Sequence, residues 1–207
     1  LLQQCYNIAD TLIVGQCIGS GALAAVGSAY TLMVFLISIL LGLSMGSSTV
    51  FSLQYGAGRM KALRRSIYVS AVLIGTVTIV LNIAALSFIH PILKLLQIPD
   101  DIYQMMYDYL WIIFWGIGFT FIYNFYAALL RAIGNAVTPL YFLAISVVLN
   151  IGLDLFFILL LDWGIKGAAI ATIIAQGVSA LGIMGYTYAK CCLLYTSPSP
   201  RDRQKSR

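Results

Sequence analysis

Asn150 and Asp154 lie four residues apart in a long apolar run of the sequence. The run covers residues 139–161, and Asp154 is its one charged residue. It is long enough to cross a bilayer as a helix, and the spacing places both polar side chains on one face. A charge at mid-bilayer costs about 2.5–3.5 kcal/mol on insertion scales, so such a residue normally faces the protein interior and marks an ion or proton path.

Two further polar residues are expected at the same depth on other helices. Asp154 lies eight residues before Asp162 in the following link. Asp10 lies nine residues before Gly19 in another link. At 1.5 Å of rise per residue, each carboxylate lies about 12–14 Å from the end of its helix at that link. Thr172 reaches the same depth on the last apolar segment. Two carboxylates, an amide and a hydroxyl could therefore converge in one bundle.

This set of side chains predicts a site that takes up one cation. Hard oxygen ligands suit sodium, and two neighbouring carboxylates without a nearby cation favour uptake of a proton. The choice between the two stays open, because the same oxygens serve both, and no other metal or cofactor is expected. The alternative is that Asn150 and Asp154 only hold helices together, through contacts worth about 0.6–2 kcal/mol.

The composition is that of an integral membrane protein. Hydrophobic residues make up 61% of the 207, and charged residues 9%, against about a quarter in soluble domains. Residues 11–58 and 66–89 carry no charge. The net charge of +5 does not indicate nucleic-acid binding, because four of the twelve Lys and Arg lie in the last seven residues and most others lie near helix ends.

Six apolar segments predict an all-α membrane protein, a six-helix bundle. They cover residues 1–18, 22–55, 66–89, 102–130, 139–161 and 165–188. The second exceeds the roughly 20 residues that a span needs, so it is expected to tilt or to bend at Gly42 and Gly46. Residues 91–98 are too short to cross and are predicted to lie at the interface.

Charges in the links predict the orientation. With alternating crossings, one side carries six basic residues and the other carries Lys94 and Lys166. The six are Arg59, Lys61, Arg64, Arg65, Arg131 and Lys190. Because positive charge marks the cytoplasmic side, the first helix is expected to run outward, and the bilayer is the expected environment.

Small residues and aromatics give weaker signals. The string GAAIAT at residues 167–172 permits close approach of a neighbouring helix. Tyr6 precedes Asp10 by one turn, and the fourth segment carries Tyr109 and Asn124. Their side chains could face a cationic ligand, but aromatics near helix ends also form interface belts. The cysteines show no metal spacing.

The two ends of the chain differ in character from its middle. The first residues already have the pattern of a helix interior, so the front of the first helix is expected to be missing. Residues 192–202 read CLLYTSPSPRD, which resembles the translation of a transposase sequencing adapter. We expect residues 1–190 to form one lobe and residues 191–207 to be a non-native tail; the alternative is a disordered basic tail.

Four ordered strings carry a resemblance to a known family. They are YNIADTLIVGQCIGSGALAAVG from Tyr6, LRAIGNAVTPLYF from Leu130, LNIGLD from Leu149 and GAAIAT from Gly167. Together they resemble the multidrug and toxic compound extrusion (MATE) family, in particular the N-terminal half of a prokaryotic member. Within the family, the chain is similar to the DNA-damage-inducible F branch. The resemblance implies one lobe of a twelve-helix transporter whose second six-helix lobe is absent here.

The resemblance also implies a function and a set of site residues. Such transporters exchange protons or sodium for amphipathic, often cationic, drugs. Asp10, Asn150, Asp154 and Thr172 match the family's cation-coupling residues, with the backbone of Ala168 as a further ligand. Tyr6, Tyr109 and Asn124 match positions lining the substrate pocket. The expected partners are small-molecule drugs or organic cations, and the expected location is the cell's inner (plasma) membrane.

Two rival functions fit the sequence less well. An intramembrane aspartyl protease carries Gly-x-Gly-Asp, whereas Ile151, Gly152 and Leu153 precede Asp154 here, so no enzyme is expected. A related flippase for lipid-linked oligosaccharides must hold a pyrophosphate, which needs Lys or Arg inside the cavity. The sequence offers none between its helix ends. A cation-coupled drug exporter is therefore the predicted function.

Overall fold

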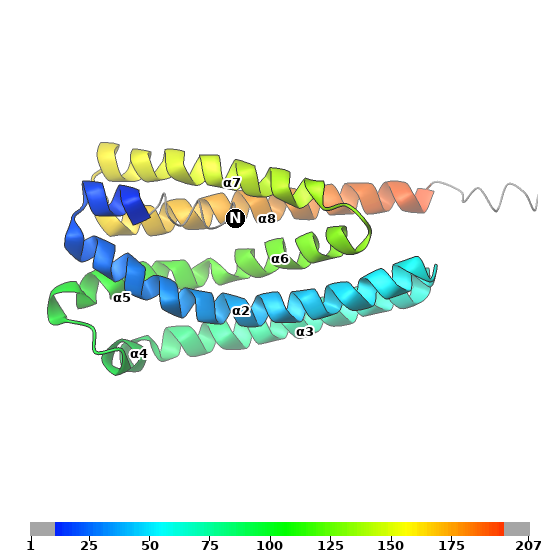
Figure 1. Ribbon diagram of the computed structural model, residues 1–207, viewed down its shortest axis with the longest axis horizontal. Helices are drawn as coiled ribbons and strands as arrows, with labels where there is room; N and C mark the ends of the chain where they lie inside the picture. Colours follow the sequence, from blue (N-terminus) through cyan, green and yellow to red (C-terminus); the bar gives the residue numbers. More distant parts are fainter. Residues whose placement is uncertain (1–10, 197–207) are drawn as a thin grey trace, which may run out of the picture.

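A computed structural model of the protein describes residues 11–196, with side chains described for residues 11–190. The long helices lie side by side along one axis and form a bundle (Figure 1). The described residues form helices and links and contain no strand. The predicted all-α fold is therefore confirmed.

The helix bounds agree broadly with the predicted segments. Residues 11–17 are the described part of the first expected segment and are helical. The elements that follow are α2 (Ser20–Gly56), α3 (Met60–Ser87), α4 (Ile89–Leu95), α5 (Asp100–Trp115), α6 (Ile117–Ala132), α7 (Val137–Leu155), the π-helix η1 (Phe156–Leu160) and α8 (Gly164–Thr196). Four helices in the described part are long and apolar enough to cross a membrane, namely α2, α3, α7 with η1, and α8. The pair α5 and α6 makes a bent fifth span.

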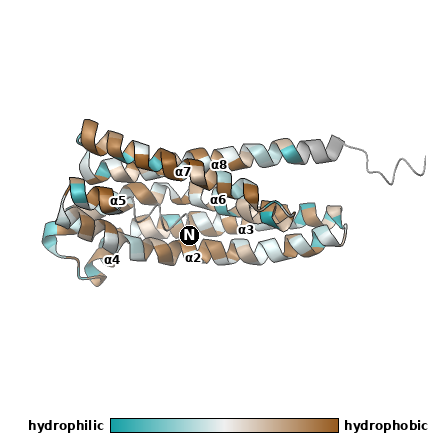
Figure 2. Ribbon diagram, turned by 45° about the horizontal axis from the view of Figure 1, so that its top comes forward, coloured by the Kyte–Doolittle hydropathy of each residue, from teal (hydrophilic) through white to brown (hydrophobic). Residues whose placement is uncertain are grey.

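Packing places α8 at the centre of the bundle. It contacts α5, α6 and α7, while α2 packs against α3, α5 and α6. The most apolar stretch of α8 is 56% buried, whereas the corresponding stretches of α3 and of α7 with η1 are 17% buried. Figure 2 shows hydrophobic residues along the long helices and hydrophilic ones concentrated near the links. The surfaces of α3 and α7 are therefore suited to lipid.

The fourth predicted span is not one straight helix. Residues 102–130 were expected to be continuous, but the helix breaks at Gly116 and its two halves are bent by 45°. At the break, the side-chain amide of Asn82 on α3 donates a hydrogen bond to the carbonyl of Phe114. Such a contact satisfies a backbone group that a helix break frees inside the membrane. A β-carbon on Gly116 would come within 2.9 Å of Ile173 on α8.

Two other expectations concern α2 and α4. The helix α2 is unbroken through Gly42 and Gly46 and curves along its length in Figure 1. The bend at these two glycines stays a prediction. The seven-residue helix α4, which follows α3 after Phe88, lies where the interfacial piece was predicted. Its place at the interface stays a prediction. It is seen nearly end-on in Figure 1, so its axis crosses those of the long helices.

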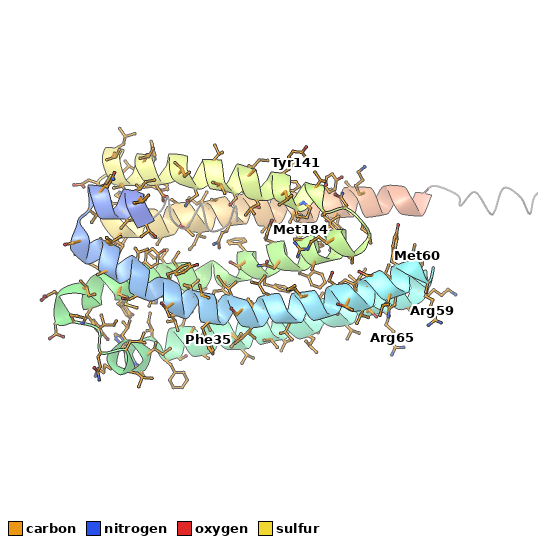
Figure 3. All side chains as sticks on the ribbon, viewed as in Figure 1. Phe35, Arg59, Met60, Arg65, Tyr141 and Met184 are labelled. Carbon is orange, nitrogen blue, oxygen red and sulfur yellow. The ribbon has the colours of Figure 1, made fainter. Side chains whose placement is uncertain are left out.

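The basic links gather toward one end of the bundle. Figure 3 shows Arg59, Met60 and Arg65 where α2 joins α3. The α6–α7 link and the end of α8 lie toward this end in Figure 1, and α4 lies toward the other. We call these the basic end and the outer end, following the charge-based orientation.

Candidate functional site

The residues Asn150 and Asp154 are fully buried on α7, each with 0% of its surface exposed. Among the nineteen residues of α7, the buried ones are these two and Pro139. The inward face of α7 is thus a polar stripe set in an otherwise lipid-suited helix. Since polar groups in a membrane interior require partners, this stripe is one of the places where α7 is attached to the lobe. The hydroxyl of Tyr123 on α6 also donates to the carbonyl of Pro139, and that of Ser179 on α8 to the carbonyl of Phe142.

One polar contact of this stripe crosses to α8. The Nδ2 of Asn150 donates a hydrogen bond of 3.3 Å to the Oγ1 of Thr172, which is 3% exposed. The predicted meeting of α7 and α8 polar groups is confirmed for this pair. Thr172 contacts Asn150, the residue of the stripe nearer the basic end, rather than lying level with Asp154 as the depth arithmetic suggests.

The Oδ1 of Asn150 is an available ligand atom. It is buried and accepts no hydrogen bond from the described residues. An unsatisfied buried acceptor costs about 1–3 kcal/mol, so such atoms are uncommon unless they serve a ligand. An amide oxygen, a hydroxyl and a carboxylate are all oxygen donors that a sodium ion accepts, and the carboxylate can instead take a proton.

Close packing of α7 and α8 surrounds this pair. The next turn after Asp154 belongs to η1, and a π-helical turn of this kind is frequent at functional sites. A β-carbon on Gly167 would lie 2.9 Å from the Cβ of Phe157 in η1 and 3.2 Å from that of Trp163. Gly167 therefore permits the close approach that the small residues of α8 predict. Ala168, beside it, is 0% exposed.

The remaining predicted site residues lie apart or outside the described chain. Asp10 and Tyr6 lie outside the described residues, so their places are not known from the structure. Tyr109 on α5 is 7% exposed, and Asn124 on α6 is 5% exposed. The Nδ2 of Asn124 donates a hydrogen bond of 2.8 Å to the carbonyl of Thr120, one turn earlier on the same helix.

Asn124 lines a small cavity between α6, α7 and α8. The other polar lining residues are Thr120, Tyr123, Ser146, Gln176 and Ser179. Its volume is about 30 Å³, enough for one or two water molecules but not for a drug. The Oγ1 of Thr120 donates a hydrogen bond of 3.0 Å to the Oε1 of Gln176 across this space.

The cavity adjoins the Asn150–Thr172 pair. Ser146 precedes Asn150 by four residues on α7, and Gln176 follows Thr172 by four residues on α8. Because α7 and α8 are antiparallel, both steps lead one turn toward the basic end. Gln176 was not predicted from the sequence, although its four-residue spacing from Thr172 was a visible signal.

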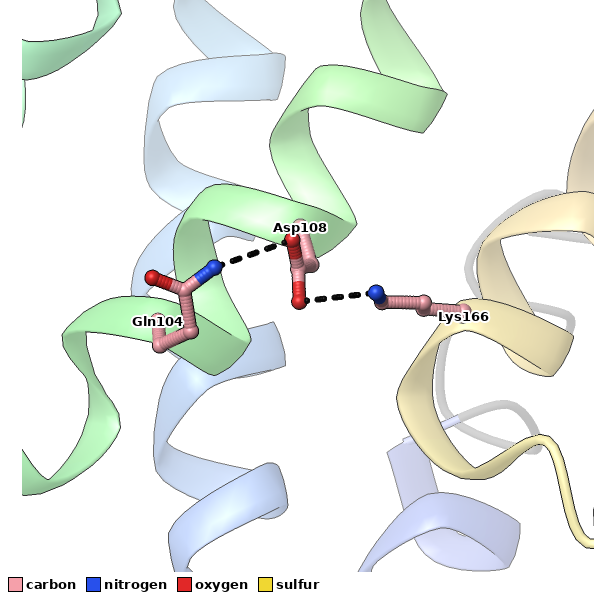
Figure 4. Close-up of polar contacts among 3 residues, drawn as sticks. All are labelled: Gln104, Asp108 and Lys166. Atoms are coloured by element: carbon pink, nitrogen blue, oxygen red, sulfur yellow. Dashed lines mark hydrogen bonds and ion pairs between the residues drawn. The ribbon is translucent and has the colours of Figure 1, made fainter.

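An ion pair joins α5 and α8 near the outer end. The Nζ of Lys166 lies 3.2 Å from the Oδ2 of Asp108, and the Nε2 of Gln104 donates to the Oδ1 of Asp108 at 3.2 Å (Figure 4). The side chains of Lys166 and Asp108 are 57% and 22% exposed. The pair lies nearer water than the α7 stripe does, and sequence reasoning did not anticipate it.

The chain is similar to known proteins of one family. The MatE family model matches residues 1–156. The chain belongs to the MATE family. It is 36% identical over 180 residues to the probable multidrug resistance protein YpnP of Bacillus subtilis (strain 168), in a match covering 87% of this chain and 40% of the relative. This MATE chain thus spans about two fifths of that relative's length.

Two solved structures are similar to this MATE lobe. One is an outward-facing multidrug resistance MATE family transporter of the MOP superfamily, with TM-score 0.85 and 26% identity over 97% of this chain and 46% of that one. The other is an inward-facing conformation of such a transporter, with TM-score 0.84 and 26% identity over 89% and 42%. The fold is therefore that of about half a MATE transporter, an integral membrane protein.

Proposed function

We propose that this chain is the N-terminal lobe of an antiporter that exports amphipathic, often cationic, drugs in exchange for protons or sodium. The family and the half-length match support a transporter lobe. Membership in the MATE family favours drug export over the flippase, and a transporter fold favours transport over proteolysis. The missing partner is a second six-helix lobe, and the proposed location is the inner membrane.

The observation that carries the coupling proposal is the buried polar stripe of α7. Asn150 and Asp154 have no exposed surface, and Asn150 is bonded to Thr172 on α8. The nearest basic residues along this part of the chain are Arg131 and Lys166, toward the two ends of the bundle. A cation bound here would therefore change the net charge of an interior otherwise lacking permanent positive charge.

The proposed mechanism is a change in helix docking. Proton or sodium uptake at Asp154, with Asp10 proposed as the second acid, neutralises charge between the helices. Asn150, Thr172 and the Ala168 carbonyl supply further oxygens. Because the stripe forms part of the contact between α7 and α8, the packing of these helices depends on the charge of the stripe. A ligand shifts a conformational equilibrium only by binding its two states differently, and this charge change provides the difference.

Drug binding is assigned to the same lobe. We propose that Tyr6, Tyr109 and Asn124 line the drug site, with aromatic faces that favour cations. The cavity at Asn124 holds about 30 Å³, so a drug would bind only after α7 moves away from α6 and α8. In this mechanism cation uptake closes the space and releases the drug outward.

Replacement of Asp154 tests the coupling role. In the full-length protein we expect Asp154→Asn to lower cation-dependent drug efflux by about tenfold or more, as for a coupling free energy of 1–3 kcal/mol. The measurement is drug accumulation in inside-out vesicles driven by a pH gradient or by a sodium gradient. The gradient that drives efflux in the parent identifies the coupling ion.

A matched control is Asp162→Asn. Asp162 is exposed in the link between η1 and α8 and has a φ of 54°, a conformation that asparagine also tolerates. We expect this variant to keep the parent's efflux. Undiminished cation-dependent efflux in Asp154→Asn would refute the proposed role.

A further inference from the structure

A second cavity lies at the outer end of the lobe, away from the α7 stripe. Its volume is about 540 Å³, within the range of small-ligand sites. It is formed by α4, the α4–α5 link and the start of α5. The lining residues are His90, Lys94, Gln97, Ile98, Asp100 and Tyr103.

The position of α4 places this cavity at the membrane surface. Ile89 and Leu93 are buried against the bundle, while Phe88, Leu95 and Leu96 are exposed by 58%, 83% and 47%. The helix crosses the axis of the bundle at its outer end (Figure 1). A short helix in this orientation, with apolar side chains exposed beside polar ones, is suited to the boundary between lipid headgroups and acyl chains.

Two opposite charges share the cavity without neutralising each other. Lys94 lies on α4 and Asp100 begins α5. Within residues 11–190, neither side chain has a hydrogen bond or an ion pair. A cavity lined by one free ammonium and one free carboxylate is complementary to a ligand that carries both a negative and a positive group.

Aromatic contacts fix the wall between these charges. The Nδ1 of His90 lies 2.7 Å from the hydroxyl of Tyr103, and the imidazole stacks on Tyr107 with ring centroids 4.7 Å apart. These contacts tie α4 to α5 and hold the cavity open between them. Tyr103 also presents an aromatic ring beside Asp100, and such rings attract an ammonium group.

We propose that this cavity binds the headgroup of phosphatidylethanolamine in the outer leaflet. The ammonium of Lys94 pairs with the lipid phosphate, and the carboxylate of Asp100 accepts hydrogen bonds from the primary ammonium. The acyl chains run past the exposed side chains of Phe88, Leu95 and Leu96. Phosphatidylglycerol has no ammonium to pair with Asp100, so it should bind more weakly.

This inference does not depend on the proposed transport function, and its test measures lipid binding alone. The full-length protein is purified in a mild detergent, stripped of lipid and titrated with phosphatidylethanolamine, with bound lipid counted by native mass spectrometry. We expect Lys94→Gln and Asp100→Asn each to raise the Kd about tenfold. The side chain of Asp100 is exposed and has no hydrogen bond or ion pair within the described residues, so Asp100→Asn should leave the fold intact.

Two variants serve as matched controls. Asp101→Asn changes the exposed neighbour of Asp100 that does not line the cavity, and Lys61→Gln changes an exposed lysine at the basic end. Both should bind phosphatidylethanolamine like the parent. Equal binding by the parent and all four variants would overturn the proposal.

Two other ligands distinguish the source of the headgroup. Phosphatidylglycerol binding should fall in Lys94→Gln and not in Asp100→Asn. The two lipids share the phosphate that pairs with Lys94, but phosphatidylglycerol has no ammonium for Asp100. Free phosphoethanolamine should compete poorly, since it lacks acyl chains for the exposed apolar residues of α4. Competition as strong as that of the lipid would assign the cavity to a soluble zwitterion and overturn the lipid proposal.

Discussion

The hydrogen bond between Asn150 and Thr172 is the residue-scale contact most open to direct test. It is buried, it joins α7 to α8, and it lies one turn from Asp154. We expect Thr172→Val to lower the free energy of unfolding by about 0.6–1.7 kcal/mol, the range measured for hydrogen bonds between membrane helices. Denaturant titration of the full-length protein in mixed micelles measures this change.

The control for this prediction is Thr76→Val. The hydroxyl of Thr76 is exposed on α3 and bonds only to the carbonyl of Val72 on its own helix. Its replacement removes the same atom without separating two helices, so the stability should change little. A similar loss in both variants would show that the cost belongs to the hydroxyl and not to the α7–α8 contact.

The candidate site is partly visible in the sequence, for a physical reason. Asn150 and Asp154 stand out because any polar group in a long apolar run is costly and needs an interior partner. Thr120 does not stand out, because neutral polar residues are common in membrane helices, and the signal for Gln176 is only its four-residue spacing from Thr172. Their hydrogen bond depends on the angle between α6 and α8, which no local pattern encodes.

At the scale of helices, the close contact of α8 with η1 depends on Gly167. A methyl group there would meet the Cβ atoms of Phe157 and Trp163 at 2.9 and 3.2 Å. These atoms lie close to the backbone and cannot rotate away. We expect Gly167→Ala to destabilise the full-length protein by about 1–3 kcal/mol through overpacking, measured as a lower midpoint of thermal unfolding.

Gly185→Ala is the matched control on the same helix. A β-carbon at Gly185 would meet no atom within 4 Å. Alanine is also the better helix former, so this variant should be as stable as the parent or slightly more stable. If both variants behaved alike, the close approach at Gly167 would not limit the packing of α8.

The break between α5 and α6 shows what the sequence pattern leaves out. An apolar run without proline predicts one helix, and residues 102–130 have that pattern. Neighbouring helices stabilise the bend at Gly116. The amide of Asn82 on α3 donates a hydrogen bond at the break, and Ile173 on α8 packs where a side chain on residue 116 would lie. Lengths and ends of spans follow from hydropathy, but a kink of this kind requires the neighbours.

For the whole molecule, the two structural matches indicate a lobe that keeps most of its packing, apart from the proposed movement of α7. The fold is about equally similar to the outward-facing and inward-facing transporters, with TM-scores of 0.85 and 0.84. Alternating access in transporters of repeated architecture is largely a rocking of one repeat against the other. Most contacts within this lobe outside α7 should therefore be kept during transport.

Spin-label distances test this rigidity. Leu53 on α2 and Leu181 on α8 are exposed by 69% and 53%, so nitroxide labels there should not disturb packing. In the full-length protein, we expect the distance between them to stay the same with and without drug or coupling cation. A shift comparable to that of a pair spanning the two lobes would contradict rigid motion.

The sparse burial of α7 has one more consequence, for the order in which the lobe opens. A helix whose fully buried residues are one proline and two polar groups buries fewer apolar side chains than α8 does. Such an element belongs to the least protected part of a structure. Deuterium should therefore enter the amides of α7 earlier than those of α8, and a bound cation should slow that uptake at α7 first.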